Sequence, residues 1–290
     1  MRILVVGGGG MLGHQFCQGW RDRHEVWATV RGSAPGGAGA PEPTRVITDV
    51  DVRRLESVAE AIARVRPDAV INAVGIVKQR PAAKEFIPSI EVNALFPHHL
   101  ARLATEAGAR MVHLSTDCVF SGEKGHYAES DPPDPVDLYG RTKLLGEVSE
   151  ASNCLTLRTS IIGLELSTRE GLVEWFLAQR GTVRGFRRAI YSGLTTAEMA
   201  RAIEHFLLHD PGLSGVWHLA SAPIDKHAML VGLLARLPAR GVEIVPDDAV
   251  VCDRSLDGSA LRGRSAFRVK PWDVMLDELG EAIRRRESTT

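Results

Sequence analysis

The 290-residue chain lacks the features that mark several classes of protein. Its four cysteines lie far apart without a CxxC pair, which argues against a zinc site or a disulfide framework and favours a reduced, cytoplasmic setting. No stretch approaches the roughly 20 apolar residues that span a bilayer, and the first apolar run is too short for a signal peptide. The formal net charge of -1 gives no reason to expect nucleic acid or a membrane as a partner.

Short apolar runs alternate with longer amphipathic segments through the first half of the chain. The apolar runs predict strands at 3–6, 25–30, 45–47, 69–74, 110–115 and 154–158. Helical stripes fill 52–64 and 89–107, whereas the segment 32–43 is rich in glycine, alanine and proline and is expected to be a loop. This alternation predicts an α/β fold with a doubly wound parallel sheet of the Rossmann-like kind.

The pattern changes after Gly163. We expect a dinucleotide-binding domain over 1–162 and a smaller, mainly substrate-binding region over 163–290, from which a strand and a helix within about 196–220 return to the first domain. A capping box at 195–198 opens that helix. Other expected elements are a strand at 216–220, helices at 228–237 and 272–285, and a loop at 256–271.

Glycines follow the first strand in GxxGxxG spacing, at Gly7, Gly10 and Gly13. Glycine lets the backbone approach a pyrophosphate, and the N-terminus of the next helix supplies free N–H groups. This context predicts a dinucleotide site. The second strand ends near Arg31 without the carboxylate that would bind a ribose 2′-hydroxyl, so NADPH is the predicted cofactor, with NADH as the alternative. Arg31 pointing into solvent is the competing interpretation.

Tyr139 and Lys143 stand four residues apart at the start of a predicted helix, so their side chains share one face. A nearby ammonium favours the phenolate, and we expect Lys143 to lower the pKa of Tyr139 from about 10. The pair is therefore a candidate for proton exchange with a carbonyl or an alcohol. An isolated pair with this spacing can also consist of a packed tyrosine and a solvated lysine.

With these motifs the chain resembles the extended short-chain dehydrogenase/reductase family, and within it the dTDP-4-dehydrorhamnose reductases and related sugar-nucleotide reductases. The resemblance rests on 7–13, 49–50, 72–75, 92–93, 115–120, 139–143 and 157–160. It implies reduction of the 4-keto group of a nucleotide-activated deoxysugar by NADPH. Tyr139 would protonate the developing alkoxide, while Thr116 and Lys143 would stabilise charge. Asn93 would support helix geometry or a water bound to the lysine.

The resemblance also implies contacts with both ligands. Predicted cofactor contacts are Gly7, Gly10, Met11, Leu12, Gly13, Arg31, Asp49, Val50, Ala73, Val74, Gly75, Tyr139 and Lys143. Predicted substrate contacts are Thr116, Asp117, Cys118, Trp175, Arg184, Arg187 and Tyr191, with arginine for a diphosphate and aromatic rings for stacking. A surface basic run is the alternative for two of the arginines in this segment. Arg254, Asp257 and Arg262 fall in a polar loop that the resemblance places near the pocket.

Cys118 narrows the chemistry that the resemblance implies. Relatives that eliminate water carry a glutamate at this position, so a 4,6-dehydratase is disfavoured, and rhamnose-type reductases usually carry an aromatic residue, so the sugar stays open. A 4-epimerase with retained NAD and a non-catalytic binding or regulatory subunit are the alternatives. The sequence offers no cluster of metal ligands, so no metal is predicted, and a homodimer is among the possible assemblies.

Overall fold

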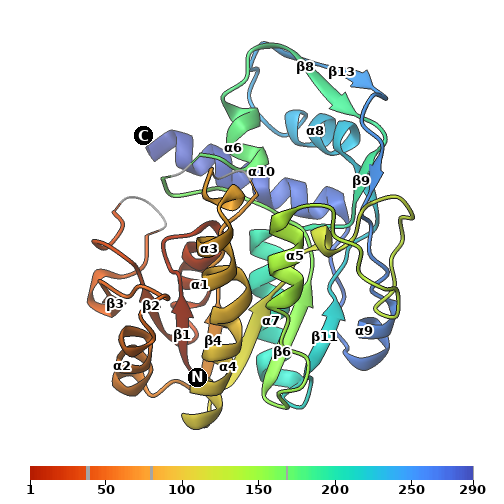
Figure 1. Cartoon of the computed structure of the whole chain (residues 1–290). Coiled ribbons are helices and arrows are strands. Elements are labelled where there is room, and N and C mark those ends of the chain that lie inside the picture. Colours follow the sequence, from red (N-terminus) through yellow and green to blue (C-terminus); the bar gives the residue numbers. More distant parts are fainter. Residues whose placement is uncertain (37–39, 79–80, 168, 290) are drawn as a thin grey trace.

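A seven-stranded sheet forms the centre of the molecule, shown in Figure 1 as a computed structural model that describes residues 1–36, 40–78, 81–167 and 169–289. The strand order is β11-β6-β5-β4-β1-β2-β3, and each pair of neighbours is parallel. The strands are β1 (Arg2–Val6), β2 (Glu25–Thr29), β3 (Val46–Ile47), β4 (Ala69–Asn72), β5 (Arg110–Leu114), β6 (Cys154–Arg158) and β11 (Gly215–His218). Of the loop predicted at 32–43, residues 37–39 lie outside the described residues.

Both faces of the sheet are buried because side chains alternate between the faces along each strand. Ile3 packs in one apolar cluster with Phe16 and Trp20, while its neighbour Leu4 packs in another with Val58. The strands are therefore continuous apolar runs, as expected for a parallel sheet covered on both sides. The predicted doubly wound α/β fold is confirmed.

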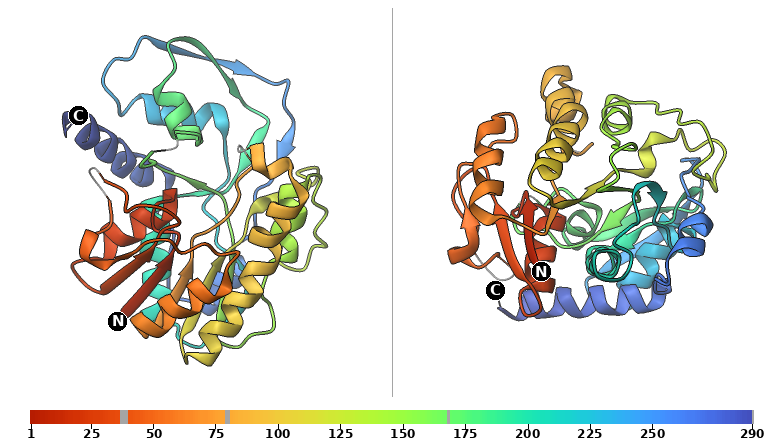
Figure 2. Two further views of the ribbon diagram at one scale, coloured as in Figure 1. Left: turned by 60° about the vertical axis from the view of Figure 1, so that its left-hand side comes forward. Right: turned by 90° about the horizontal axis from the view of Figure 1, so that it is seen from below.

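Helices cover the two faces and connect the strands (Figures 1 and 2). The α-helices of the described residues, including two that lie away from this sheet, are α1 (Met11–Trp20), α2 (Leu55–Val65), α3 (Phe86–Ser89), α4 (Phe96–Glu106), α5 (Leu138–Leu145), α6 (Leu172–Leu177), α7 (Thr196–His209), α8 (Lys226–Leu234), α9 (Ser259–Arg264) and α10 (Trp272–Thr289). The expected cap of α7 is present, because Thr195 Oγ1 accepts a hydrogen bond from the Glu198 amide at 3.3 Å. Within the described residues, no helix combines the length and apolarity needed to cross a membrane.

Two predicted elements were wrong in detail. The single helix expected at 89–107 is divided, because a π-helix over Ile90–Leu95 separates α3 from α4. The loop expected at 256–271 contains the short helix α9, in which only Leu261 is buried. One buried residue in six leaves no apolar stripe for a periodicity argument to detect.

The second half of the chain contributes to two parts of the molecule. Strand β11 pairs with β6, and α7 packs on α1, where Trp20 Nε1 donates to the Ala200 carbonyl at 3.2 Å. The other part, called here the small lobe, contains α6, α8 and the strands β8 (Gly181–Phe186), β9 (Ala189–Tyr191), β12 (Ile224–Asp225), β13 (Val242–Asp247) and β14 (Cys252–Asp253). Strands β7 (Ile161–Ile162) and β10 (Leu194–Thr195) form a further parallel pair. Helix α10 contacts both α7 and α8 and so links the two parts (Figure 2).

Candidate active site

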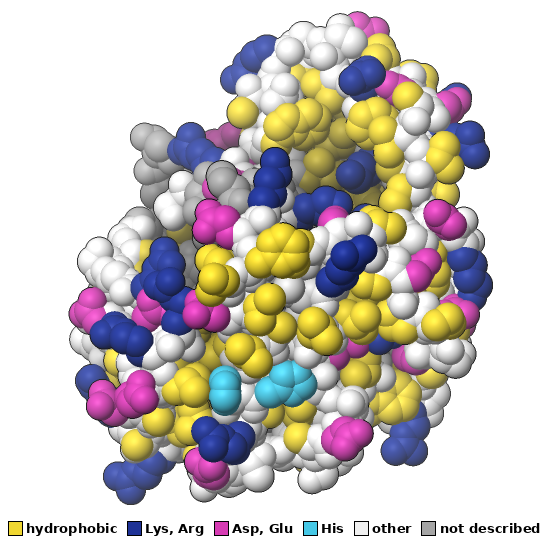
Figure 3. All heavy atoms as spheres, in the orientation of Figure 1, with side chains coloured by type: hydrophobic (Ala, Val, Ile, Leu, Met, Phe, Trp, Pro, Cys, Tyr) yellow, Lys and Arg dark blue, Asp and Glu magenta, His cyan; other side chains and the backbone are white. Residues whose placement is uncertain are grey.

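The predicted site residues of the first domain follow the carboxyl ends of neighbouring strands. The glycine loop follows β1, Ala73 follows β4, and Thr116 follows β5 after one intervening residue. In parallel sheets these ends meet at one edge, where ligands bind. Figure 3 shows the surface hollowed between the small lobe and the part below it, with hydrophobic and basic side chains on the walls.

Of the three glycines in GxxGxxG spacing, two are required by the protein itself and the third is not. A Cβ at Gly13 would lie 2.1 Å from the Gly7 carbonyl oxygen, and one at Gly7, whose φ is +95°, would lie 2.7 Å from Val74 Cγ2. At Gly10 the nearest atom would be 3.5 Å away, an ordinary contact. Space therefore remains in front of Gly10, beside the partly buried first turn of α1 with Met11. The unpaired N–H groups of that turn and this space fit a dinucleotide pyrophosphate.

The loop after β4 lies against the glycine loop and is held by two buried carboxamides. Asn72 Oδ1 accepts from the Val74 amide at 3.2 Å. Asn93, on the π-helix, accepts from the Ile76 amide at 2.8 Å and donates to the Ile76 carbonyl at 3.0 Å. Ala73, Val74 and Gly75, all partly buried, are thereby fixed beside Gly7. The structure assigns Asn93 a positioning role for this loop.

The remaining predicted cofactor contacts gather where β2 and β3 end. The Val50 amide donates to the Val30 carbonyl at 3.1 Å, which brings the segment containing Asp49 next to the end of β2. Asp49 is exposed with a left-handed φ of 61°, whereas Val50 is buried. Arg31 is exposed, and its charge is one of the influences that lower the pKa of Asp51, after the dominant hydrogen bonds from Arg53. The Gly8 amide donates to the Thr29 carbonyl at 2.9 Å, so the end of β2 lies beside the glycine loop. Arg31, two residues after Thr29, is accessible there.

Helix α5 brings Tyr139 to Thr116 because of the glycine between Tyr139 and Lys143. A Cβ at Gly140 would lie 2.2 Å from the Cys118 carbonyl oxygen, so only glycine allows α5 to approach the turn after β5 so closely. Asp137 caps the helix by accepting from the Gly140 amide at 2.8 Å. The Thr116 hydroxyl lies near enough to the Tyr139 phenol to lower its pKa against the effect of burial. The structure therefore brings the two predicted hydroxyls together.

Lys143 does not act on Tyr139 as the spacing predicted. Its Nζ donates to the Leu114 carbonyl at 2.6 Å, and burial lowers the pKa of Lys143 to about 8, against the opposing effect of Glu147. Burial also raises the pKa of Tyr139 above its ordinary value, and Cys118 adds to the rise, while the Thr116 hydroxyl acts in the opposite direction. The prediction of a lowered Tyr139 pKa is wrong for this structure, because burial dominates and the Lys143 ammonium is bonded to the Leu114 carbonyl.

A buried ion pair lies behind Lys143 and had no role assigned from the sequence. Arg158 Nε and Nη2 each donate to Glu147 at 2.8 Å, and both side chains are 6–7% exposed. Glu147 also accepts from Ser115 Oγ at 2.6 Å. The pair joins β5, β6 and the segment after α5 at the point where the candidate catalytic residues lie. A charged residue within an otherwise apolar strand, at Arg158, was the available sequence signal.

The turn of Thr116, Asp117 and Cys118 meets a side chain from the polar loop that follows β14. Arg254 donates from Nε to the Phe120 carbonyl at 2.9 Å and from Nη1 to Cys118 Sγ at 3.8 Å. Burial raises the pKa of Asp117, with Arg254 opposing, and raises the pKa of the Cys118 thiol to about 12. The thiol is therefore neutral at physiological pH.

The predicted substrate contacts of the small lobe have other surroundings. Arg184 and Arg187 are exposed and form ion pairs with Asp247, at 3.2 Å, and with Asp248. The structure thus gives both cations carboxylate partners within the protein. Trp175 lies on α6 and is 42% exposed. The Tyr191 ring is buried and packs edge-to-face with the Trp272 ring, with 5.8 Å between the ring centroids. Its faces are therefore not open for stacking.

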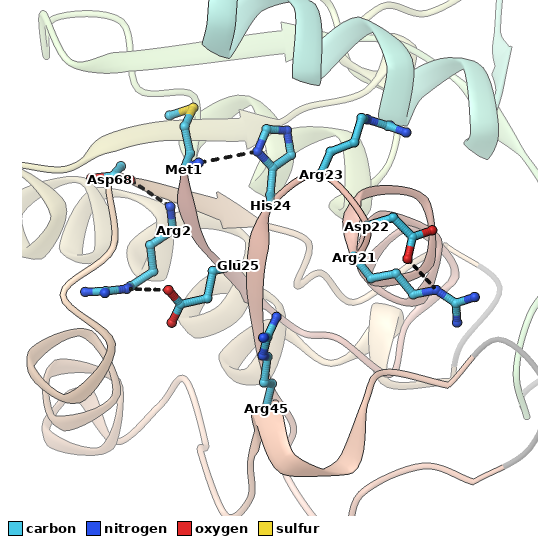
Figure 4. Close-up of a pocket in the computed structure, with 9 residues that line it drawn as sticks. All are labelled: Met1, Arg2, Arg21, Asp22, Arg23, His24, Glu25, Arg45 and Asp68. Carbon is cyan, nitrogen blue, oxygen red and sulfur yellow. Dashed lines mark hydrogen bonds and ion pairs between the residues drawn. The ribbon is translucent and has the colours of Figure 1, made fainter.

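A separate surface pocket lies at the opposite edge of the sheet, near the amino ends of β1 and β2 (Figure 4). Its charges satisfy one another: Arg2 Nε donates to Glu25 at 3.2 Å, the Arg2 amide donates to Asp68 at 2.7 Å, and Arg21 lies 3.7 Å from Asp22. This pocket is remote from the predicted site residues. Across the part of the chain that the structure describes, no group of three or more His, Cys, Asp or Glu side chains is placed to hold a metal ion.

Comparisons with known proteins agree with this geometry. The chain is 29% identical to the dTDP-4-dehydrorhamnose reductase of Salmonella typhimurium, covering 98% of this chain and 96% of that protein. It is also 29% identical to the spore coat polysaccharide biosynthesis protein SpsK of Bacillus subtilis, covering 91% and 93%. The structure of dTDP-4-dehydrorhamnose reductase from Bacillus anthracis in complex with NADP has a similar fold, with a TM-score of 0.79 at 20% identity over 97% of this chain and 99% of that one.

A family model, the RmlD substrate binding domain, matches residues 1–246 and therefore most of the chain. The resemblance drawn from the sequence motifs is confirmed, together with the oxidoreductase class. The chain belongs to the RmlD substrate binding domain family, within the extended short-chain dehydrogenases/reductases.

Proposed function

We propose that the protein uses NADPH to reduce the 4-keto group of a nucleotide-activated deoxysugar, and that Tyr139 donates the proton. The observation that carries this proposal is the convergence of Thr116, Tyr139 and Lys143 at the sheet edge that also holds the glycine loop. The Salmonella typhimurium relative, named for such a reduction, supports the reaction type. The NADP complex of the Bacillus anthracis protein supports the cofactor, with NADH as the alternative.

The cofactor would lie across the glycine loop, with its pyrophosphate in the space at Gly10 and the loop 73–75 along its side. When bound, NADPH supplies the hydride. The exposed Arg31 would meet the 2′-phosphate, since no carboxylate stands at that position. Arg31→Ala should lower the ratio of kcat/KM with NADPH to kcat/KM with NADH by about tenfold or more, as expected for a lost charge-assisted contact. An unchanged ratio would remove Arg31 from the site.

Proton transfer is assigned to groups whose protonation at neutral pH suits reduction. Tyr139 is a neutral phenol at pH 7, as an ordinary tyrosine is, and its raised pKa keeps it in that form; its Oη gives the proton to the carbonyl oxygen of the sugar. Thr116 Oγ1 hydrogen-bonds the same oxygen. Lys143, with a pKa of about 8, is mainly cationic at pH 7 and stabilises the phenolate that remains.

Cys118 favours reduction over dehydration within this family. Elimination of water requires a further acid/base pair, and a thiol whose pKa is about 12 does not supply one near neutral pH. A 4-epimerase would use the same tyrosine and lysine but would retain its nicotinamide cofactor. Purification without bound NAD, and exchange of cofactor at each turnover, would therefore favour the reductase. A non-catalytic subunit would show no turnover at all.

The test is oxidation of NADPH followed against a panel of nucleotide-linked 4-keto-6-deoxysugars. Tyr139→Phe should reduce kcat by about 10²-fold or more, the usual range for loss of a general acid, and should leave the Kd for NADPH within about twofold. For the wild type, kcat should fall as pH rises through about 8, because Lys143 then loses its charge. Folded wild type that reduces none of the panel, or a Tyr139→Phe variant with full activity, would refute the proposal.

A homodimer is our proposal for the assembly. Four apolar side chains on or beside the neighbouring helices α3 and α5 are more than half exposed: Phe86 at 68%, Ile87 at 71%, Val136 at 58% and Leu145 at 66%. Figure 3 shows hydrophobic side chains gathered on this side of the molecule. Exposed patches of this kind mark protein contacts. Analytical ultracentrifugation should show a dimer for the wild type and a monomer for Ile87→Glu, and a monomeric wild type would contradict the proposal.

A further inference from the structure

Glu147 follows Lys143 by four residues, directly after the end of helix α5. Both side chains reach the same strand end. Lys143 Nζ donates to the Leu114 carbonyl at 2.6 Å, and Glu147 Oε1 accepts from Ser115 Oγ at 2.6 Å. The four-residue spacing of the candidate catalytic pair is thus continued by a third residue, which contacts the segment 114–116 beside the lysine.

The Glu147 carboxylate is almost fully buried. Its side chain is 6% exposed, and it accepts hydrogen bonds from Nε and Nη2 of Arg158, both at 2.8 Å. Taking both charges out of water costs free energy, and a buried ion pair adds little net stability compared with apolar side chains of similar volume. The stability of the fold is therefore weak grounds for a charged pair at this position.

Arg158 is held on its other sides and fixes the carboxylate at the strand end. Its guanidinium lies 5.3 Å from the centroid of the Phe120 ring, and Nη1 lies 3.3 Å from His218 Nε2. His218 Nδ1 is 3.0 Å from the Tyr127 carbonyl, an acceptor, so we assign the proton to Nδ1 and let Nε2 accept from Arg158. Burial lowers the pKa of His218, which agrees with a neutral ring.

Lys143 is the cation on which the Glu147 carboxylate acts. Burial lowers the pKa of Lys143 to about 8, and Glu147 opposes this change. An opposite charge nearby commonly shifts a pKa by about one unit or more. Without the carboxylate we therefore expect a Lys143 pKa of about 7 or lower, so that the amine would be mostly neutral at pH 8.

The other titratable groups that face Lys143 carry no negative charge at neutral pH. Tyr139, on the same helix, is a neutral phenol because burial raises its pKa. His113, on β5, is neutral because burial, Lys143 and His98 all lower its pKa. Among the described residues, Glu147 is thus the anion that favours the ammonium form of Lys143.

We propose that Glu147 is a positioning residue for the candidate catalytic pair, and that its buried carboxylate keeps Lys143 charged while Tyr139 gives up its proton. This rests on the proposed function, in which the ammonium stabilises the phenolate that remains. Glu147 acts through Lys143 and not on the substrate, because its carboxylate is occupied by Ser115 and Arg158.

The experiment compares Glu147→Gln, which keeps the size of the side chain and removes its charge, with Glu150→Gln, in which an exposed carboxylate three residues later loses the same charge. One arm titrates protein labelled with carbon-13 at lysine Cε by NMR, and Lys143 is the resonance that Lys143→Met lacks. The other arm measures kcat for reduction of a nucleotide-linked 4-keto-6-deoxysugar at pH 6 and pH 8. Because Glu147→Gln leaves Arg158 without its carboxylate, the double variant Glu147→Gln/Arg158→Met, which buries no unpaired charge, is measured in both arms.

The pKa of Lys143 should be about 8 in the wild type and in Glu150→Gln, and lower by about one unit or more in Glu147→Gln and in the double variant. The ratio of kcat at pH 6 to kcat at pH 8 should then be about fivefold larger for Glu147→Gln than for the wild type. A merely structural role would lower kcat alike at the two pH values.

A Lys143 pKa in Glu147→Gln, or in the double variant, that matches the wild type would overturn the proposal, as would a kcat that falls equally at pH 6 and pH 8. The NMR arm needs no turnover. A wild type that reduces none of the sugars would refute the proposed function and would still leave the effect of Glu147 on Lys143 measured.

Discussion

Replacing Lys143 by methionine should abolish activity and yet stabilise the fold at neutral pH. The side chain is 4% exposed, and burial lowers its pKa from 10.5 to about 8. Each pKa unit corresponds to about 1.4 kcal/mol, so the charged form costs the folded state about 3 kcal/mol relative to the unfolded chain. Methionine, of similar length, avoids this cost. It also loses the hydrogen bond from Nζ to the Leu114 carbonyl, worth about 1–2 kcal/mol.

The difference in free energy of unfolding between Lys143→Met and the wild type depends on pH. The unfolded lysine keeps its proton up to about pH 10.5, whereas the folded one loses it near pH 8. Between these values the unfolded state binds more protons, so the free energy of unfolding of the wild type rises with pH. The methionine variant lacks this contribution. We therefore expect Lys143→Met to be about 1–2 kcal/mol more stable than wild type at pH 7 and equal or less stable at pH 10.

Urea unfolding measures the free energy of unfolding of the wild type and of Lys143→Met at pH 7 and at pH 10. Lys84→Met is the control, because Lys84 is exposed and its loss should change the free energy of unfolding by less than about 0.5 kcal/mol at either pH. The difference between the two variants isolates the buried ammonium from the titration of all other groups. If Lys143→Met were destabilised equally at the two pH values, Lys143 would not be buried as a charged group, and the assigned role of its charge would fall with it.

Two further substitutions test the framework of the site. Gly13→Ala should destabilise the protein by about 1–3 kcal/mol, because its Cβ would meet the Gly7 carbonyl at 2.1 Å. Gly10→Ala should keep the wild-type Tm and weaken NADPH binding at least tenfold. Thermal melts measure the first effect, and titration calorimetry with NADPH measures the second. Arg158→Met should cost about 3–5 kcal/mol in urea unfolding by leaving a buried carboxylate unpaired, against less than about 1 kcal/mol for Arg102→Met in an exposed pair with Glu106. Equal losses for the two arginines would contradict the burial argument.

The sheet could be predicted from the sequence because each strand carries its own signal. In β1 all of Ile3 to Val6 are buried, and such apolar runs need no knowledge of distant residues. The π-helix over Ile90–Leu95 could not be predicted in this way. Its Asn93 binds the Ile76 backbone, 17 positions earlier, and this long-range contact rather than local propensity accompanies the change in helical geometry.

The residues of the candidate site differ in the same way: some follow from the sequence alone, and others depend on contacts between distant segments. Helical spacing alone predicts the pair of Tyr139 and Lys143, whereas Thr116 is predicted through the family resemblance. Arg184 was grouped with the substrate by its charge, but its partner Asp247 stands on the strand that pairs with β8, which the sequence did not predict. Arg254 was noted only as part of a polar loop, since its approach to Cys118 depends on how β14 packs.

The protonation state of Tyr139 is the point at which geometry changes the chemical interpretation. An i, i+4 spacing brings two side chains to one helical face, but Lys143 reaches inward to the Leu114 carbonyl, and burial governs the phenol. A reductase must give a proton to its substrate, and a neutral phenol is ready to do so at pH 7. An epimerase needs the same neutral phenol when it returns the proton in its second half-reaction, so the protonation state of Tyr139 at pH 7 fits both reactions. What separates the two is the cofactor, which a reductase must exchange at every turnover and an epimerase retains.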